Sequence, residues 1–285
     1  MGVYCKREML DHFAALRYTR EDKTKREGGR ALPGKGDYIA VFDSGVGGVS
    51  VLRELLALMP DEKYLYFGDS ANAPYGTKTT EQVRALTLAA AERLMARGCK
   101  ALVVACNTAT AAAINDLRAI YTDRIIIGIE PALKVAADHF PGGEIGVMAT
   151  PVTLREEKFD VLLHRFTDTC TVHKIPAPGV VQLVEQGKAT GGEMEALLAP
   201  LLSPYKDKLC AVVLGCTHYP FAAPVIGKLL GENTALLDGG PGTARQTKRR
   251  LEAEGLLWDG PGELIIENSS GDAAMIKRCL ELLNG

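Results

Sequence analysis

Two similar stretches decide the expected fold of this chain: ALVVACNTAT at residues 101–110 and AVVLGCTHYP at residues 211–220. Each is a short apolar run that ends in a cysteine followed by side chains with amide, hydroxyl or imidazole groups. Such a run between polar breakers is typical of a parallel strand buried on both faces, although periodicity alone does not exclude a helix segment. Ligands of open α/β sheets bind beyond the carboxyl ends of the strands. The sequence therefore predicts one thiol, Cys106 or Cys216, at that edge in each of two similar halves.

The composition is that of a globular protein without a nucleic-acid or membrane signature. The 285 residues suffice for two modest cores, and the formal net charge of −2 gives no electrostatic reason to bind nucleic acid or an anionic membrane. No apolar run approaches the roughly 20 residues of a membrane-spanning helix. Charged residues near the N-terminus, such as Lys6 and Asp11, argue against a signal peptide. The cysteines lack the spacing of a disulfide framework or a CxxC metal site, which predicts a reducing, cytoplasmic location.

The pattern predicts an α/β fold with two pseudo-symmetric, doubly wound parallel-sheet lobes and the active site in the cleft between them. Residues 1–37 form a charged extension of linker composition, in which 9–18 are compatible with a short helix. We expect a first lobe at 38–133 with 243–285 and a second at 134–242, because the strand–turn–helix unit starts again near residue 144. The remaining expected strands lie at 38–42, 64–67, 125–129, 144–150, 171–175, 210–214, 235–237 and 264–267.

A glycine-rich turn, DSGVGG at residues 43–48, follows the first expected strand and leads into a helical segment. Such a turn is a ready anion site, because backbone N–H groups and the helix dipole favour negative charge. Glycines that merely permit a tight turn explain it equally well. The turn fits neither GxGxxG nor GxxxxGK[ST], so a dinucleotide or triphosphate site is not indicated. Asp43 favours a functional interpretation, because a carboxylate at this strand end is costly unless it has a role.

A second loop at the same predicted edge carries Tyr75 and Gly76. It precedes a helix that Thr79 and Gln82 are expected to open as a capping box. Tyr75 is either a surface residue or, with the backbone N–H of Gly76, a grip for a carboxylate.

The residues around the two cysteines indicate proton chemistry. Cys106 lies at or just before a helix N-terminus, where the dipole favours a thiolate. His218 follows Cys216 by two residues, where an imidazole can control the proton of that thiol or hold a substrate group.

Several uses of the two thiols compete. A disulfide is disfavoured in a reducing compartment, and Cys106, Cys216 and His218 barely supply the three or four ligands that zinc needs. A hydrolytic nucleophile uses one thiol and leaves the second unexplained. A pair with one ionised and one protonated thiol suits removal of a proton from one face of a carbon and its return to the other. The repeat therefore favours racemisation.

DSGVGG, PYG, ACNTAT, LVEQG and GCTHYP, in this order, resemble the motifs of the glutamate racemase family of the cofactor-independent aspartate/glutamate racemase superfamily. The similarity runs from about Tyr38 to near the C-terminus. It implies interconversion of L- and D-glutamate for peptidoglycan synthesis without pyridoxal phosphate or metal, and the family often forms homodimers. The alternatives are a racemase of aspartate or another amino acid, and a non-catalytic protein of the same fold that binds a small carboxylate.

The resemblance also implies roles for individual residues. Cys106 is expected to act on the D-glutamate face with assistance from Asp43, and Cys216 on the L-glutamate face with assistance from Glu185 and His218. Tyr75 and Gly76, with Thr217 nearby, are expected to take the side-chain carboxylate. The residues expected to hold the amino and α-carboxylate groups are Asp43, Ser44, Asn107, Thr108, Thr217 and His218.

Overall fold

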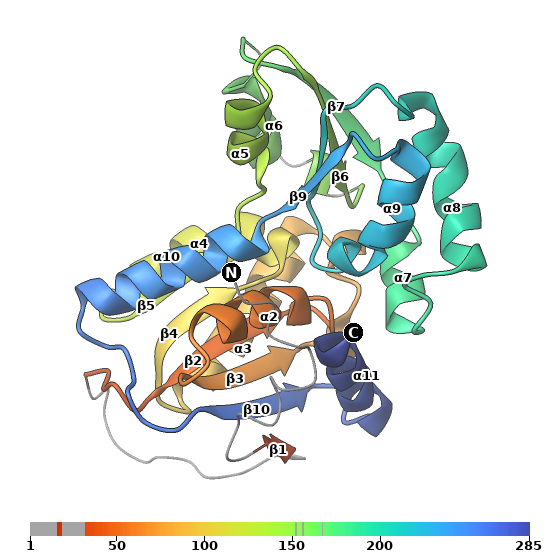
Figure 1. The fold of residues 1–285 in the computed structure, drawn as a ribbon. Helices are drawn as coiled ribbons and strands as arrows, with labels where there is room; N and C mark the ends of the chain where they lie inside the picture. Colours follow the sequence, from red (N-terminus) through yellow and green to blue (C-terminus); the bar gives the residue numbers. More distant parts are fainter. Residues whose placement is uncertain (1–15, 19–31, 152, 156, 167) are drawn as a thin grey trace. The chain divides into compact units, whose positions relative to one another are not determined.

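A computed structural model describes residues 16–18, 32–151, 153–155, 157–166 and 168–285, and the chain divides into two compact units. Unit 1 comprises Met1–Ile129 with Gly240–Gly285, and unit 2 comprises Glu130–Gly239. Each unit is a parallel sheet with helices on both faces (Figure 1), which confirms the predicted α/β class. Most of the expected N-terminal extension, including Cys5, lies outside the described residues.

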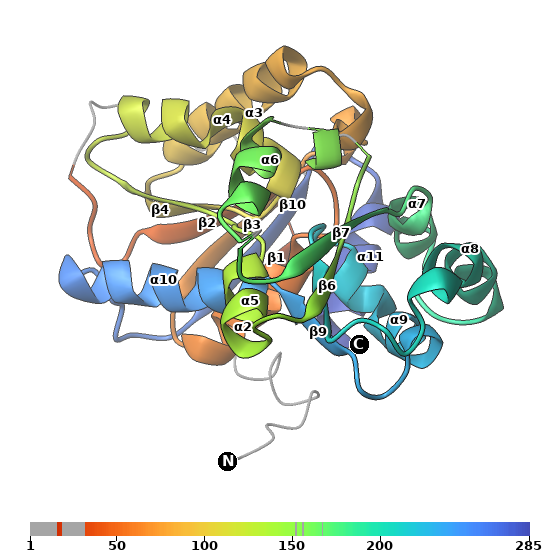
Figure 2. The same cartoon turned by 90° about the horizontal axis from the view of Figure 1, so that it is seen from above.

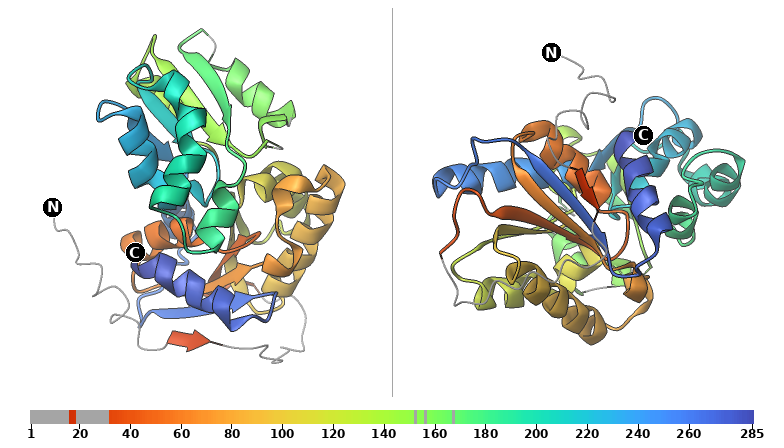
Figure 3. Two further views of the ribbon diagram at one scale, coloured as in Figure 1. Left: turned by 90° about the vertical axis from the view of Figure 1, so that its right-hand side faces the viewer. Right: turned by 90° about the horizontal axis from the view of Figure 1, so that it is seen from below.

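The described strands of unit 1 form a six-stranded sheet in the order β1-β10-β3-β2-β4-β5, with every neighbouring pair parallel. Helices α3 and α4 cover one face, and α2, α10 and α11 cover the other (Figures 2 and 3). The strands are β1 (Leu16–Tyr18), β2 (Tyr38–Asp43), β3 (Lys63–Gly68), β4 (Cys99–Val104), β5 (Ile125–Gly128) and β10 (Glu263–Asn268). The helices are α2 (Val49–Leu58), α3 (Thr80–Met95), α4 (Asn107–Ile120), α10 (Gly240–Ala253) and α11 (Ala273–Asn284), with 3-10 turns η1 (Ser70–Asn72) and η2 (Tyr75–Thr77).

The described strands of unit 2 form a four-stranded parallel sheet in the order β7-β6-β8-β9. Helices α5 and α6 lie on one face, and α7, α8 and α9 lie on the other (Figure 1). The strands are β6 (Glu144–Ala149), β7 (Thr171–Pro176), β8 (Ala211–Leu214) and β9 (Ala235–Asp238). The helices are α5 (Leu133–His139), α6 (Glu157–His164), α7 (Val180–Glu185), α8 (Gly192–Leu202) and α9 (Ala223–Leu230), with 3-10 turns η3 (Thr153–Arg155), η4 (Ser203–Tyr205) and η5 (Tyr219–Ala222).

The two sheets share one winding order. In unit 1, β2 lies between β3 and β4, and in unit 2, β6 lies between β7 and β8. β2 and β6 therefore each have the next two strands of the chain on opposite sides, so the connections change direction beside them. Such a switch point is where open α/β sheets bind ligands, at the carboxyl ends of the strands. The two similar stretches of sequence thus supply equivalent strands, β4 and β8.

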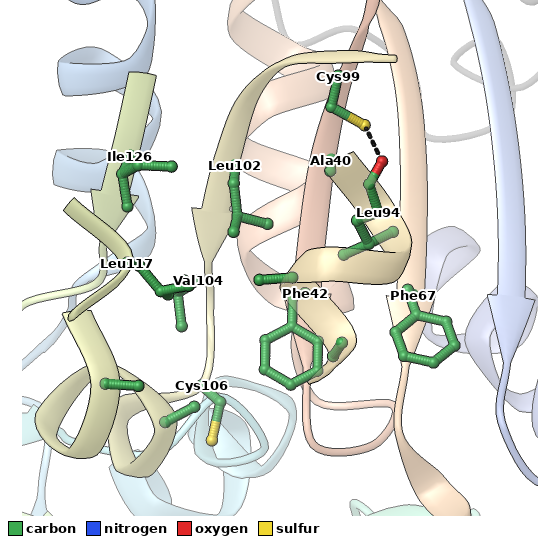
Figure 4. Packing of buried hydrophobic residues seen from close by; sticks show 14 of the residues in the cluster. Ala40, Phe42, Phe67, Leu94, Cys99, Leu102, Val104, Cys106, Leu117 and Ile126 are labelled. Carbon is green, nitrogen blue, oxygen red and sulfur yellow. Dashed lines mark hydrogen bonds between the residues drawn. The ribbon is translucent and has the colours of Figure 1, made fainter. Parts of the chain in front are cut away.

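Local sequence explains the elements that surround the β4 end. Every residue of β4 is buried, as a central parallel strand requires. On α4, Ala109, Ala113 and Leu117 recur every four residues and are buried in an apolar cluster with strand side chains (Figure 4). The predicted capping box of α3 is confirmed, since Thr79 accepts from the Gln82 N–H and the Gln82 side chain accepts from the Thr79 N–H.

The expected strands are confirmed with small differences at their ends. Residues 9–15 of the short helix expected near the N-terminus lie outside the described residues, and its last three residues are not helical. Leu16–Tyr18 is a strand that pairs in parallel with β10. The open edge of β10 supplies hydrogen-bond partners that no local pattern reveals. None of the helices in the described part of the chain has both the length and the apolar character needed to cross a bilayer.

A buried ion pair closes the amino edge of unit 1. Lys100, in the completely buried β4, places its Nζ 2.7 Å from Oε2 of Glu62. The same ammonium donates to the carbonyls of Lys35 and Leu256, while Oε1 of Glu62 accepts from the Trp258 N–H at 2.9 Å. Because each charge has several partners, the pair ties together the segments that precede β2, β3 and β10.

Lys100→Met should lower the free energy of unfolding by about 3–5 kcal/mol, because it leaves the Glu62 carboxylate buried without a cation. Urea denaturation followed by circular dichroism measures the change. Lys134→Met, which removes one half of the exposed Lys134–Asp138 pair, is the control and should change stability by less than about 0.5 kcal/mol. Equal unfolding midpoints for the two variants would show that the buried pair does not stabilise this edge.

Candidate active site

Cys106 lies where unit 1 is expected to bind ligands. It is the N-cap residue of α4 and follows the end of β4 by two residues. The backbone N–H of Ala105 donates to the carbonyl of Phe42 at 2.8 Å, which joins this turn to the end of β2. In Figure 4, Cys106 lies beyond the carboxyl end of β4, next to the apolar cluster, and the residue is 6% exposed. The predicted position at a helix N-terminus is confirmed.

The end of β2 brings a carboxylate and a hydroxyl to the same place. Asp43 is completely buried, and its Oδ2 accepts from the Gly45 N–H at 3.0 Å. The thiol of Cys106 lies 3.4 Å from Oγ of Ser44. Asn107 and Thr108, the first residues of α4, are half-buried beside it in the chain. Unit 1 therefore groups Asp43, Ser44 and Cys106 as the sequence predicted.

The loop after β3 gives Tyr75 an unexpected partner. The Tyr75 side chain is buried, and its hydroxyl donates to Oδ2 of Asp69 at 2.7 Å. Asn72 donates to the same carboxylate, and the Asp69 N–H donates to the carbonyl of Asp43. The pKa of Tyr75 is raised well above its usual range, mainly by burial. The hydrogen bond to Asp69 and the negative charge of Asp69 raise it further, and the charges of Cys106 and Asp43 make smaller contributions.

The Tyr75 phenol is therefore committed to Asp69, and what this loop offers a ligand is its backbone. Within the described part of the chain, the N–H groups of Tyr75 and Gly76 make no hydrogen bond. Asp69 was missed by the sequence analysis, although it is a polar residue directly after a strand, which is the signal that pointed to Asp43.

Cys216 in unit 2 has the same relation to its sheet as Cys106 has to its own. It follows the end of β8 by two residues, and the N–H of the preceding Gly215 donates to the carbonyl of Met148 at 2.7 Å. Phe42 pairs with Val104 in unit 1, and Met148 pairs with Leu214 in unit 2. The two cysteines are therefore equivalent residue for residue, as the repeated stretch predicted.

A chain of polar contacts leads away from Cys216. Its Sγ lies 3.8 Å from Nδ1 of His218, and Nε2 of His218 lies 3.2 Å from Oε1 of Glu185, the last residue of α7. His218 is 3% exposed and Thr217 is 5% exposed, while the Glu185 side chain keeps 26% of its surface exposed. Unit 2 thus groups Cys216, Thr217, His218 and Glu185. An imidazole between a thiol and a carboxylate can move a proton to or from the sulfur.

The two thiols differ in their support. The residue of unit 2 that corresponds to Asp43 is Ala149, because Asp43 ends β2 and Ala149 ends the equivalent strand β6. In unit 1, the carboxylate near the thiol is Asp43, at the end of a strand. In unit 2, it is Glu185, at the end of a helix, and His218 lies between it and the thiol.

Other cysteines have structural positions. Cys99 donates to the carbonyl of Leu94, and burial raises the pKa of its thiol to about 12 (Figure 4). Cys170 and Cys279 are buried, while Cys210 is half-buried. Within the described ranges, no group of three or more His, Cys, Asp or Glu side chains is arranged to hold a metal ion.

The sequence of residues 43–247, which contains both cysteines and their partners, matches the Asp/Glu/Hydantoin racemase family. This match covers well over half of the chain. The chain belongs to the Asp/Glu/Hydantoin racemase family. It is accordingly an enzyme of the racemase class.

Individual relatives agree with this assignment. The chain is 46% identical over 248 residues to a glutamate racemase of Clostridium botulinum, which covers 86% of this chain and 96% of the relative. A crystal structure of glutamate racemase from Francisella tularensis in complex with D-glutamate shares 27% identity and a TM-score of 0.78, covering 88% of this chain and 95% of that one. A structure from Escherichia coli, in complex with L-glutamate and the activator UDP-MurNAc-ala, shares 31% identity and a TM-score of 0.78, covering 87% and 94%.

Gly48→Ala should disturb the Cys106 group, because an added Cβ would lie 2.5 Å from Cβ and 3.0 Å from Cγ of Asp43. We expect a loss of stability and a fall in racemase activity of roughly tenfold or more, since small displacements of catalytic groups are costly. Gly242→Ala is the matched control, because no atom lies within 4 Å of its added Cβ. Thermal unfolding and turnover measure both variants, and equal behaviour of the two would contradict the close packing at Asp43.

Proposed function

We propose that this enzyme interconverts L- and D-glutamate by moving a proton between the two faces of Cα, with one cysteine serving each face. The main support for the proposal is that the two units repeat the same arrangement of a strand followed by a cysteine. Cys106 and Cys216 follow equivalent strands of two sheets with the same winding order, and each has polar partners of its own. Glutamate as the substrate is supported by the similarity to glutamate racemases over 86% of the chain.

The proposed reaction is symmetric. In the direction from L- to D-glutamate, the thiolate of Cys216 takes the Cα proton and becomes a thiol. The electron pair left on Cα spreads into the α-carboxylate, and the thiol of Cys106 donates its proton to the opposite face and becomes a thiolate. One S–H bond forms as the C–H bond breaks, and one breaks as the new C–H bond forms. Each sulfur is the base in one direction and the acid in the other.

The partners of the sulfurs would maintain these opposite protonation states. An imidazolium at His218, held by the Glu185 carboxylate, favours a thiolate at Cys216 and can receive or return a proton. The negative charge of Asp43 near Cys106 opposes an accumulation of thiolate there and attracts the ammonium group of the substrate. These two environments suit a pair of thiols that must exchange roles in each turnover.

The remaining polar residues would bind the substrate. We propose that the amino and α-carboxylate groups are held by Asp43, Ser44, Asn107, Thr108, Thr217 and His218. The backbone N–H groups of Tyr75 and Gly76, which make no hydrogen bond within the described residues, would hold the side-chain carboxylate with Thr217 nearby. Donors around the α-carboxylate would also stabilise the charge that develops when Cα loses its proton.

The chemistry proposed here needs neither pyridoxal phosphate nor a metal, because two thiols supply acid and base while the substrate's own carboxylate takes up charge. We further propose that the D-glutamate formed serves peptidoglycan synthesis, that the enzyme works in the cytoplasm, and that it forms a homodimer. Racemisation in the absence of a cofactor is the part that an assay tests directly.

The purified chain should racemise L-glutamate without added cofactor, and L-aspartate much more slowly, as followed by polarimetry. Cys106→Ser and Cys216→Ser should each lower kcat/KM by roughly 10²- to 10⁴-fold, because each removes the acid or base of one face. Cys99→Ser is the control, since this thiol is buried in the core and donates only to the carbonyl of Leu94 among the bonds of the described residues.

Preference for aspartate would point to the rival racemase, and no turnover of either substrate would favour a binding protein. Near wild-type activity in either Cys106→Ser or Cys216→Ser would exclude the assignment of one sulfur to each face.

In D₂O, product formed early from either enantiomer should carry deuterium at Cα while the remaining substrate carries little. The reason is that the proton delivered to the product comes from the second thiol, which has exchanged with solvent. Nuclear magnetic resonance or mass spectrometry of the separated enantiomers measures the label. Equal labelling of product and remaining substrate would indicate one base that acts on both faces.

A further inference from the structure

Tyr219 connects the two parts of the Cys216 group. It is the third residue after Cys216 and is completely buried. Its N–H donates to the carbonyl of Cys216 at 3.0 Å, and its hydroxyl donates to the carbonyl of Ala177 at 2.8 Å. Ala177 directly follows β7 and lies just before α7, the helix that carries Glu185. A single side chain therefore joins the turn that carries the thiol to the loop that leads to the carboxylate.

Helix α7 needs such an external support. It has only six residues and begins after Gly179, which has a left-handed backbone with a φ of 91° and provides no side-chain cap. So short a helix is not held by its own hydrogen bonds and depends on packing. It packs against η5, the turn that begins with Tyr219. The 3.2 Å separation of His218 and Glu185 therefore depends on where this contact places α7.

Unit 1 contains the same construction built from different residues. Asp69 corresponds to Ala177, because the N–H of Asp69 donates to Asp43 and that of Ala177 donates to the equivalent Ala149. Asp69 accepts from the hydroxyl of Tyr75, which is also buried. A buried tyrosine thus holds the residue that follows β3 in unit 1, through its side-chain carboxylate, and the residue that follows β7 in unit 2, through its backbone carbonyl. The two tyrosines occupy unrelated positions in the two repeats, so the contact recurs without being copied in the sequence.

We infer that Tyr219 is a positioning residue for the Cys216 half of the site: its hydroxyl, through Ala177, holds Glu185 against His218 and so sets the proton balance of Cys216. The kinetic part of this inference rests on the proposed function. The part that concerns the protonation of Cys216 depends only on contacts within unit 2.

The electrostatic surroundings agree with this role. Burial, followed by the charge of Cys216, raises the pKa of Tyr219 well above its usual range, so its hydroxyl remains a donor. In unit 2, both α7 and α9 pack against η5. Glu185 is the ionisable residue of α7, and Lys228, that of α9, lies 2.8 Å from Glu195 on α8. Of these two side chains, Glu185 is the one that contacts His218, at 3.2 Å.

The test compares Tyr219→Phe with Tyr64→Phe. Both substitutions remove a hydroxyl from a completely buried tyrosine and keep the ring, but Tyr64 donates to the carbonyls of Leu55 and Met59 at the end of α2. Alkylation by iodoacetamide is measured across pH for each cysteine by peptide mass spectrometry. The reactivity of Cys99, buried in the core, reports any unfolded fraction in the same sample.

In Tyr219→Phe, the pH at which Cys216 becomes half-reactive should rise by about half a unit to one unit, because a loosened Glu185 weakens the imidazolium that favours the thiolate. Cys106 should keep its profile, and Tyr64→Phe should change neither thiol. Glu185→Gln should produce the same rise, and adding Tyr219→Phe to it should produce no further rise, because both act through one contact.

Isotope effects supply the kinetic readout. The equilibrium constant of a racemase is one, so kcat/KM must fall equally in both directions. An impaired Cys216 makes proton removal from L-glutamate more rate-limiting. Tyr219→Phe should therefore increase the isotope effect with [2-²H]-L-glutamate and decrease the effect with [2-²H]-D-glutamate.

An unchanged Cys216 profile in folded Tyr219→Phe, or an additive rise in the double variant with Glu185→Gln, would overturn the positioning role. Failure of the unmodified enzyme to racemise glutamate would instead overturn the proposed function, and the alkylation comparison would still decide the role of Tyr219.

Discussion

Hydrogen bonds between neighbouring parallel strands decide where chemistry can take place in this protein. The Ala105 N–H donates to the Phe42 carbonyl and the Gly215 N–H donates to the Met148 carbonyl. Each bond lies at the carboxyl end of a strand pair, β2–β4 or β6–β8. In both units the next residue is a cysteine, which therefore leaves the sheet at the switch point, between β2 and β4 in unit 1 and between β6 and β8 in unit 2. Because side chains alternate along a strand, a shift of one residue in either pairing would turn the strand's side chains to the opposite face.

The same scaffold supports two unlike thiols. Cys106 lies beside a serine hydroxyl and near a buried aspartate from β2, whereas Cys216 lies beside an imidazole that a glutamate from α7 holds. If both sulfurs serve one carbon, as proposed, this difference is useful. A two-base reaction needs one protonated and one ionised sulfur, and identical surroundings would provide no preference for either arrangement. The two units thus share one strand order, but the charged and polar groups around their cysteines differ.

In unit 1, the structural ion pair and the charged residues of the proposed site lie at opposite edges of the sheet. Lys100 and Glu62 pair at the amino edge, where carbonyls and a backbone N–H satisfy the remaining atoms of both groups. Asp43, Asp69 and Cys106 lie at the carboxyl edge. Burial of a charge is tolerated at either edge only with partners. The partners at the amino edge belong to the protein, whereas the Tyr75 loop at the carboxyl edge keeps backbone donors without a partner in the described residues.

Local sequence patterns were enough to predict most of the elements and the strand ends that carry Cys106 and Cys216. Apolar runs predicted the strands, the Thr79–Gln82 spacing predicted the cap of α3, and the repeated stretch predicted Cys106 and Cys216 at equivalent strand ends, because these patterns are local. Tertiary structure alone decided the rest. The burial of Lys100, the partner of Tyr75, the bond from Tyr219 to Ala177 and the edge strand Leu16–Tyr18 all depend on chain segments that meet only after folding. Tyr75 and Asp69 are only six residues apart, but no periodic pattern marks their bond, and the members of the other pairs lie far apart in the sequence.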